Sequence, residues 1–240
     1  MNNVIYLKMV DMEQTHWWYK GRREIIGKLA LPFLGSKINM LDAGCGAGGT
    51  MEYMSKYGSV IGVDISREMV EHCRNIGLSA YCASVDNLPF ADHAFDLVFC
   101  LDVLEHLSDE RSALKELVRV VRPGGILLFT VPAFSWLWGK HDDLNNHYRR
   151  YNRGDFSKLI RDFDLSMERT TYFNFFLLPP IWFIRKMSKH PLFQKETDFE
   201  FGMGAVNELL FALLRMEGAI LRFTNIPIGV SQVMVVRKIK

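Results

Sequence analysis

The sequence predicts an α/β fold in which a doubly wound, largely parallel sheet is covered by helices on both faces. Interior strands of parallel sheets read as nearly continuous apolar runs, and crossover helices separate them. At 240 residues, the chain has the length of one domain with a sizeable core. Apolar runs near 38–43, 59–64, 79–83, 95–101 and 125–131 alternate with helical patterns near 48–57, 67–77 and 108–122.

The first apolar run leads into the glycine cluster Gly44, Gly46 and Gly49, which precedes a helix. Glycines there let the backbone turn sharply beside a ligand, and the N–H groups of a helix start favour anionic groups. The spacing fits the dinucleotide fingerprint, a weak signal alone. However, the Asp42 carboxylate suits a cationic ammonium better than a pyrophosphate. Asp64, about 20 residues on, stands where ribose hydroxyls are held. S-adenosylmethionine carries both an amino-acid end and a nucleoside end.

From about residue 38 to 131 the chain resembles the class I S-adenosylmethionine-dependent methyltransferases, in a type 11-like form. Besides the glycine loop, the motifs in order are ASVDNLPF at 83–90, FDLVFC at 95–100, VLEHL at 103–107 and RPGG at 122–125. The resemblance implies a Rossmann-like sheet of seven strands, in which the last strand is antiparallel and inserts between strands five and six. It also implies that S-adenosylmethionine is the methyl donor and S-adenosylhomocysteine the product.

The resemblance implies a set of cofactor-binding residues. Ser84 stands where the family often has an acidic residue, so the adenine contact would fall to the Ser84 hydroxyl and the Val85 N–H, with Asp86 as an alternative. We expect His106 to border the cofactor, with a role as a base as the alternative. The full set is Trp18, Tyr19, Arg22, Asp42, Gly44, Cys45, Gly46, Asp64, Ile65, Ser84, Val85, Leu101 and His106.

The N-terminal segment, residues 1–37, combines clustered aromatics with arginines ahead of a helix predicted over 23–34. We interpret it as a lid: an aromatic ring would face the sulfonium, and an arginine would pair with the methionine carboxylate. The alternative is that the aromatics only dock the helix on the sheet.

The stretch 132–152 leaves the carboxyl end of the fifth strand, where binding loops concentrate. If the acceptor is a hydroxyl it needs a base, and the candidates, in order, are His141, His147 and Tyr151. A self-packed loop is the alternative. His141, Asp142 and His147 would also suit a metal, but methyl transfer needs none, and we expect no metal.

We expect one methyltransferase domain over 1–240, divided into the lid segment, a cofactor-binding core at 38–172, a helical insert at 173–228 and a last strand at 229–240. The insert is very apolar, but its proline-broken first run is too short to span a bilayer. It would wall an apolar substrate pocket, form a dimer face, touch a membrane surface through Arg185, Lys186 and Lys189, or simply pack on the core.

The predicted function is methyl transfer to a small, partly apolar or lipid-linked acceptor, by a monomer or homodimer. A net charge of +2 without a basic run indicates no nucleic-acid partner. Four cysteines without a C-x-x-C pair indicate reduced thiols and a cytoplasmic location. The alternatives are a non-catalytic S-adenosylmethionine-binding module for a protein partner, a protein methyltransferase, and a nicotinamide oxidoreductase, which Asp42 disfavours.

Overall fold

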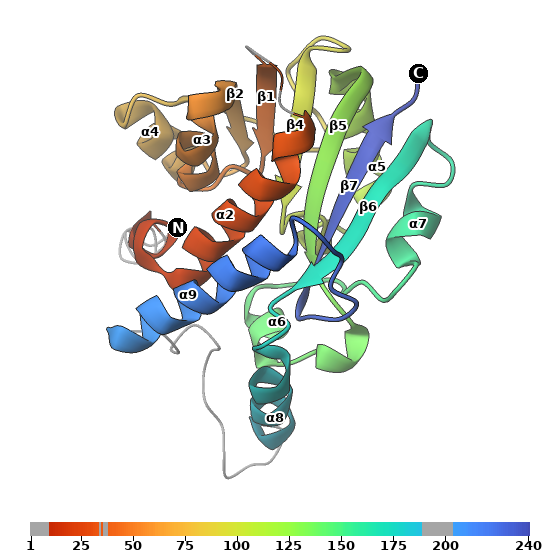
Figure 1. The fold of residues 1–240 in the computed structure, drawn as a ribbon. Coiled ribbons are helices and arrows are strands. Elements are labelled where there is room, and N and C mark those ends of the chain that lie inside the picture. The colour runs from red at the N-terminus through yellow and green to blue at the C-terminus, as the bar shows by residue number, and fades with distance from the viewer. Residues whose placement is uncertain (1–9, 34, 36–37, 189–203) are drawn as a thin grey trace.

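The computed structural model describes residues 10–33, 35, 38–188 and 204–240, and within them it forms a seven-stranded sheet (Figure 1). The strand order is β3-β2-β1-β4-β5-β7-β6, and only β7 runs antiparallel to its neighbours. The predicted sheet, including the insertion of the last strand, is therefore confirmed. The strands are β1 (Ile38–Ala43), β2 (Gly58–Asp64), β3 (Ser79–Cys82), β4 (Phe95–Leu101), β5 (Val121–Pro132), β6 (Leu165–Phe173) and β7 (Ser231–Lys238).

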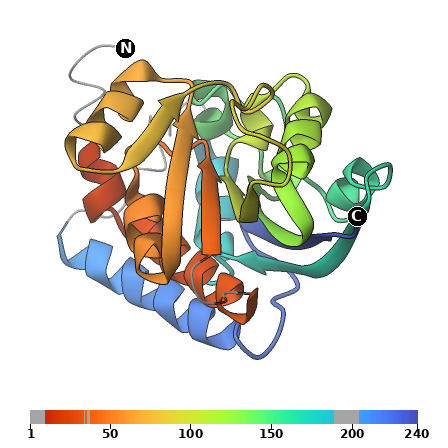
Figure 2. The same cartoon turned by 90° about the horizontal axis from the view of Figure 1, so that it is seen from above.

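Two apolar layers cover the sheet, one on each face (Figure 2). On one face Leu114 and Leu117 of α5 pack with Phe129 of β5. On the other, α2 and α9 lie side by side, and Ile26 and Leu214 pack on the strands. The helices are α2 (Trp17–Ala30), α3 (Gly49–Met54), α4 (Arg67–Asn75), α5 (Glu110–Val120), α6 (Lys140–Leu144), α7 (Asp155–Leu159), α8 (Leu178–Ser188) and α9 (Ala205–Ile220).

Helix α2 begins earlier than the sequence pattern predicts. His16 has an extended backbone, and its ring nitrogen accepts a hydrogen bond from Trp18 N at 3.3 Å, which caps the helix at Trp17. The aromatic cluster therefore lies in the first helical turn rather than in a loop before it. The helix ends at Ala30, followed by a 3₁₀ turn over Leu31–Phe33.

Helix α9 of the insert packs directly on α2. At their crossing, a Cβ added to Gly21 would lie 2.3 Å from Leu214 Cδ1, so the glycine permits the close approach. A polar contact also joins the two helices, because Lys20 of α2 pairs with Glu208 of α9 at 3.3 Å. The α9 part of the insert therefore packs on the core through the N-terminal helix α2. Residues 187–204 are polar in sequence and predict a loop; apart from 187, 188 and 204, they lie outside the described residues.

Strand β5 begins four residues before the predicted start at 125. Val121 already pairs with Phe95, and the register then shifts so that Ile126 pairs with Leu97. The RPGG motif is therefore an irregularity within a strand pair rather than a turn ahead of it. Among the described helices, none combines the length and hydropathy that a membrane span requires.

Candidate cofactor and acceptor site

The glycine loop after β1 has a backbone that side chains would disrupt. Gly44 has a φ of 88° and Gly46 a φ of 51°, both in the left-handed region. The N–H groups of Gly44 and Cys45 donate to Val63 O at 2.7 and 2.9 Å, which ties the loop to β2. A Cβ on Gly44 would lie 2.3 Å from Val103 Cγ2. The loop is thereby fixed between β2 and the segment that follows β4.

The two acidic residues predicted from the sequence lie at the carboxyl ends of adjacent strands. Asp64 at the end of β2 accepts from Gly46 N at 2.9 Å and from Ser66 N at 2.8 Å. Asp42 on β1 is only 2% exposed. Burial raises the pKa of Asp42 to about 8; the Arg22 charge opposes the shift, and other carboxylates nearby add to it. Several carboxyl groups thus crowd this site, and a cationic ligand would favour the ionised form of Asp42.

A third carboxylate, which the sequence analysis did not assign, occupies the glycine loop. Glu13 accepts from Ala47 N at 2.9 Å and from Gly49 N at 3.1 Å. These are N–H groups at the start of α3, where a helix favours anions. The signal in the sequence was an acidic residue just ahead of the aromatic cluster, but nothing in the spacing connects it to a loop more than 30 residues away. The loop is therefore shown to accept a carboxylate.

Arg22 lies at the carboxyl edges of β4 and β5. Its Nη1 contacts Asp102 Oδ2 at 2.5 Å, and Thr130 Oγ1 donates to the same oxygen at 2.8 Å. Its guanidinium lies 4.7 Å from the Trp18 ring centroid and 5.5 Å from that of Tyr19. Burial raises the pKa of Tyr19 to about 12, so the hydroxyl stays protonated. The arginine predicted to hold the methionine carboxylate thus joins α2 to the strand edge through Asp102.

The remaining predicted cofactor residues differ in exposure. Cys45, Val85 and Leu101 are buried, Ser84 is half-buried, and His106 is exposed in the 3₁₀ turn Leu104–His106. Ile65, directly after Asp64, is 78% exposed. An apolar side chain left so open beside an acidic strand end offers a surface for a flat ring. The cofactor role of these residues stays a prediction.

The loop after β5 is built around one buried carboxylate, Asp142. It receives Arg150 Nε at 2.7 Å, Gly139 N at 2.8 Å and His147 Nδ1 at 2.9 Å, and Arg185 of α8 lies 3.8 Å away. Burial alone would raise the pKa of Asp142, but the hydrogen bonds and the neighbouring charges hold it well below its usual range. From the sequence, Asp142 would also suit a metal, although no metal is expected; in the structure Asp142 organises the loop.

Three histidine rings gather beside this carboxylate. The His147 ring centroid lies 4.6 Å from that of His106 and 6.0 Å from that of His141. Because His147 Nδ1 is bound to Asp142, its Nε2 is the nitrogen available to another group. The structure therefore brings two of the three predicted base candidates together and adds His106, which was expected on the cofactor side.

Tyr151, the third base candidate, is positioned differently. It is buried, and its hydroxyl donates to Glu110. Burial and that carboxylate raise the pKa of Tyr151 far above its ordinary value. Its backbone also pairs with the start of the loop, since Tyr151 N donates to Pro132 O at 2.9 Å. This geometry indicates a residue that anchors the loop, and it does not favour Tyr151 as a base.

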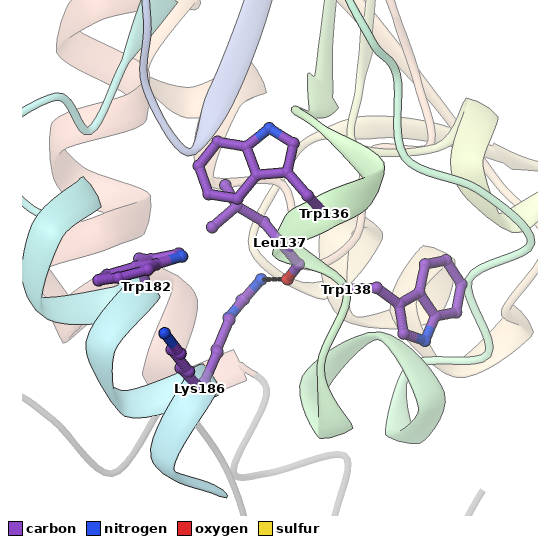
Figure 3. Close-up of a pocket in the computed structure, with 6 residues that line it drawn as sticks. Trp136, Leu137, Trp138, Trp182 and Lys186 are labelled. Carbon is purple, nitrogen blue, oxygen red and sulfur yellow. Dashed lines mark hydrogen bonds between the residues drawn. The ribbon is translucent and has the colours of Figure 1, made fainter. Parts of the chain in front are cut away.

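A small aromatic pocket lies between this loop and α8 (Figure 3). Its volume is about 80 Å³. Arg185, one of the lining residues, donates to Leu137 O at 2.5 Å and lies 3.8 Å from Asp142, so it links the pocket to the Asp142 network. The lining residues are Trp136, Leu137, Trp138, Trp182, Arg185 and Lys186.

Comparison with known proteins agrees with this arrangement. Residues 41–129 match the family model described as a methyltransferase domain. A ubiquinone biosynthesis O-methyltransferase of Coxiella burnetii is 27% identical over 138 residues, which are 51% of this chain and 59% of that protein. The chain thus spans less than two thirds of that relative's length.

Solved structures share the fold at low sequence identity. A putative methyltransferase in complex with the Trm112 methyltransferase activator of Haloferax volcanii superposes with a TM-score of 0.62 at 20% identity, covering 95% of this chain and 92% of that one. Geranyl diphosphate methyltransferase in complex with SAM gives a TM-score of 0.58 at 16% identity, with 92% and 90% covered. Residues 41–129 therefore match a methyltransferase domain, and the chain shares its fold with solved structures of methyltransferases.

Proposed function

We propose that this protein transfers a methyl group from S-adenosylmethionine to a hydroxyl group of a small, partly apolar acceptor. S-adenosylmethionine supplies an activated methyl group, which an oxygen lone pair takes by direct displacement from the sulfonium. The protein's own part is to hold donor and acceptor in line and to exclude water.

One observation carries the proposal: the glycine loop is complementary to an amino-acid zwitterion. The N–H groups of Ala47 and Gly49 already bind a carboxylate, that of Glu13. Asp42, buried at the end of β1, offers the opposite charge to an ammonium. An amino acid carries an ammonium and a carboxylate on the same carbon, so it can meet Asp42 and these N–H groups at once. A pyrophosphate would meet the carboxylates of Asp42 and Asp64 instead.

The other predicted residues complete the donor site in this proposal. Asp64 receives the ribose hydroxyls, and the exposed Ile65 covers one face of the adenine. Ser84 and the N–H of Val85 lie toward the other edge of the base. Arg22 holds Trp18 and Tyr19 against the strand ends, where they cover the sulfonium.

The acceptor side supports a hydroxyl substrate. A hydroxyl must lose a proton as its oxygen attacks, and the pair His141 and His147 offers nitrogen acceptors for it. The aromatic pocket beside Arg185 supplies apolar walls for the rest of the acceptor. A lipid-linked acceptor, peripheral membrane contact, the oligomeric state and the cytoplasmic location stay predictions.

Calorimetric titration with S-adenosylmethionine and, separately, NAD tests the donor site on wild type and Asp64→Ala. We expect micromolar binding of S-adenosylmethionine that Asp64→Ala weakens at least tenfold, about 1.4 kcal/mol. NAD should not bind. The matched control is Asp164→Ala, an exposed carboxylate just before β6, which we expect to change binding less than threefold. NAD binding in place of S-adenosylmethionine would overturn the proposal.

Turnover is then measured as S-adenosylhomocysteine formed with a panel of phenols and aliphatic alcohols, each with and without an alkyl tail. Product with at least one tailed hydroxyl compound is expected. A set of peptides is tested in parallel. If S-adenosylmethionine binds tightly but neither the hydroxyl compounds nor the peptides give product, the non-catalytic binding module is favoured. Product only with peptides would favour a protein methyltransferase.

A further inference from the structure

Beside the acceptor loop lies a cluster of side chains that the proposed function leaves unexplained. Glu105, His106 and His147 each offer one ligand atom, and these three atoms lie within 4.8 Å of one another. Glu105 and His106 come from the 3₁₀ turn after β4, whereas His147 comes from the loop after β5. Tyr148 N donates to Glu105 O at 2.7 Å and clamps the two segments together. The cluster is therefore a fixed feature of the fold rather than a chance meeting of surface residues.

Glu105 is an unusual member of this cluster. It is 1% exposed, and its Oε2 has no hydrogen-bond partner among the described residues. A buried carboxylate oxygen without a partner is unfavourable. The two arginines whose charges act on Glu105 are paired with other carboxylates: Arg22 contacts Asp102, and Arg150 contacts Asp142. An ion bound at Glu105 Oε2 would supply the missing partner.

A hydrogen-bond acceptor fixes the orientation of each of the two histidine rings. His147 Nδ1 is bound to Asp142 at 2.9 Å, and the backbone carbonyl of Asn145 accepts a hydrogen bond from the His106 ring. Metal-binding histidines characteristically donate their second ring N–H to a carboxylate or carbonyl, which fixes the tautomer and leaves the other nitrogen for the ion. His106 is exposed while Glu105 is buried, so an ion has a path from solvent.

We propose that Glu105, His106 and His147 bind a divalent transition-metal ion of the Zn²⁺ or Mn²⁺ class. Two imidazole nitrogens and one carboxylate oxygen suit such ions better than Mg²⁺ or Ca²⁺, which prefer oxygen ligands. Metal–ligand bonds of about 2.0–2.2 Å set the ligand atoms of a tetrahedral ion roughly 3.4 Å apart. The three ligand atoms, now within 4.8 Å of one another, must therefore approach by up to about 1.4 Å when an ion binds. Three protein ligands leave a coordination position open.

The open position gives the ion a role that rests on the proposed function. An acceptor hydroxyl bound there is polarised and loses its proton more readily. Because His147 then binds the ion, His141 accepts the proton of the hydroxyl. The oxygen lone pair then forms the bond to the methyl carbon as the carbon–sulfur bond breaks, and its electron pair goes to sulfur. The ion changes neither charge nor oxidation state. This site is distinct from the trio considered in the sequence, because Asp142 is already occupied by Arg150 and Gly139.

The test is Zn²⁺ binding by chelator-treated protein, measured by calorimetry without S-adenosylmethionine or acceptor. Wild type is expected to bind one equivalent, and Glu105→Gln, His106→Ala and His147→Ala should each weaken binding at least tenfold, about 1.4 kcal/mol. His72→Ala, which removes a histidine of α4, is the matched control and should leave the affinity unchanged. Since His106 is exposed, His106→Ala should fold even if a variant of buried Glu105 does not.

Co²⁺ substitution supplies a spectroscopic readout. Wild type should show the visible absorption of a four- or five-coordinate Co²⁺ site, and Glu105→Gln should lose it. Wild type that binds no Zn²⁺, or Glu105→Gln that binds it with unchanged affinity, would overturn the proposal. In the second case Glu105 is merely a buried acid and the histidines alone hold the ion.

Turnover separates this proposal from the proposed function. Chelator treatment should lower kcat at least tenfold, and added Zn²⁺ or Mn²⁺ should restore it. Full turnover without metal would overturn the metal proposal but would leave the methyl-transfer proposal intact. Zn²⁺ binding by a protein that does not bind S-adenosylmethionine would overturn the methyl-transfer proposal but not the metal site.

Discussion

The donor side and the acceptor side of the site meet at one edge of the sheet, yet different forces hold them. The donor side is fixed by backbone: Gly44 N and Cys45 N bind Val63 O, and positive φ angles shape the loop. The acceptor side is fixed by charge, since Asp142 gathers Arg150 and His147 from its own loop and Arg185 from α8. A loop held by its backbone depends on glycines within a few residues. A loop held by ion pairs depends on side chains far apart in the chain.

The strongest challenge to this comparison is Asp142→Ala. The side chains of Arg150 and Arg185 are 2% and 8% exposed, and both would lose their buried carboxylate. Breaking a buried pair by removing one partner destabilises by about 3–5 kcal/mol. Urea denaturation should show a loss of that size, with methyl transfer abolished. If the variant remains folded, its S-adenosylmethionine affinity should stay within threefold of wild type. A much larger loss of affinity would show that the two sides are one unit.

Asp42→Asn probes the donor side through pH. A carboxyl with a pKa of about 8 is protonated below that pH and must ionise to hold an ammonium. Wild-type affinity for S-adenosylmethionine should therefore rise from pH 6 to pH 8. Asp42→Asn should bind at least tenfold more weakly at pH 8, about 1.4 kcal/mol, and without this slope. Calorimetry at four pH values measures both, and a flat wild-type profile would contradict the charge pairing.

Asp42→Asn should weaken ligand binding but stabilise the folded protein at pH 8. The folded pKa of Asp42 lies above its ordinary value of 3.8, so its contribution to stability is present at low pH and lost as the pH rises toward about 8. At pH 8 Asp42→Asn should be more stable than wild type by on the order of 1–3 kcal/mol. At pH 4 the difference should shrink, and thermal melts at the two pH values test this.

Glu13→Ala sharpens the picture of the donor side as a carboxylate site. In the structure the Glu13 carboxylate holds the N–H groups that the proposal assigns to the ligand. Removing it should tighten S-adenosylmethionine binding by about three- to tenfold, roughly 0.7–1.4 kcal/mol. Glu52→Ala, at an exposed acid of α3, is the control and should change little. Weaker binding of S-adenosylmethionine by Glu13→Ala would mean that Glu13 helps to hold the ligand rather than occupying its place in the glycine loop.

Tyr151→Phe should give the smallest effect. It removes the hydrogen bond to Glu110 and leaves the ring in the core, for a loss of about 1 kcal/mol of stability. Turnover should stay within threefold of wild type across pH 6–9, because the hydroxyl anchors the loop. A hundredfold fall in kcat with unchanged stability would restore Tyr151 as a base.

The sequence predicted the fold because its information is local. Each apolar run between helical patterns is a strand, and the motifs from Asp42 to the RPGG segment lie on these strands or directly after them. The main misplacements were at boundaries, at the start of α2 and of β5. There, a capping contact of His16 and a register shift opposite Phe95 overrode the pattern.

By itself, the sequence determined the sheet and the positions of Asp42, Asp64 and the glycine loop on its edge, because strand period and glycine conformation act within a few residues. Only the tertiary structure decided that Glu13 fills the glycine loop, that Arg22 meets Asp102, and that Glu105 joins two histidines. These contacts join segments tens of residues apart in the chain, and side-chain charges choose partners only after packing has brought them together.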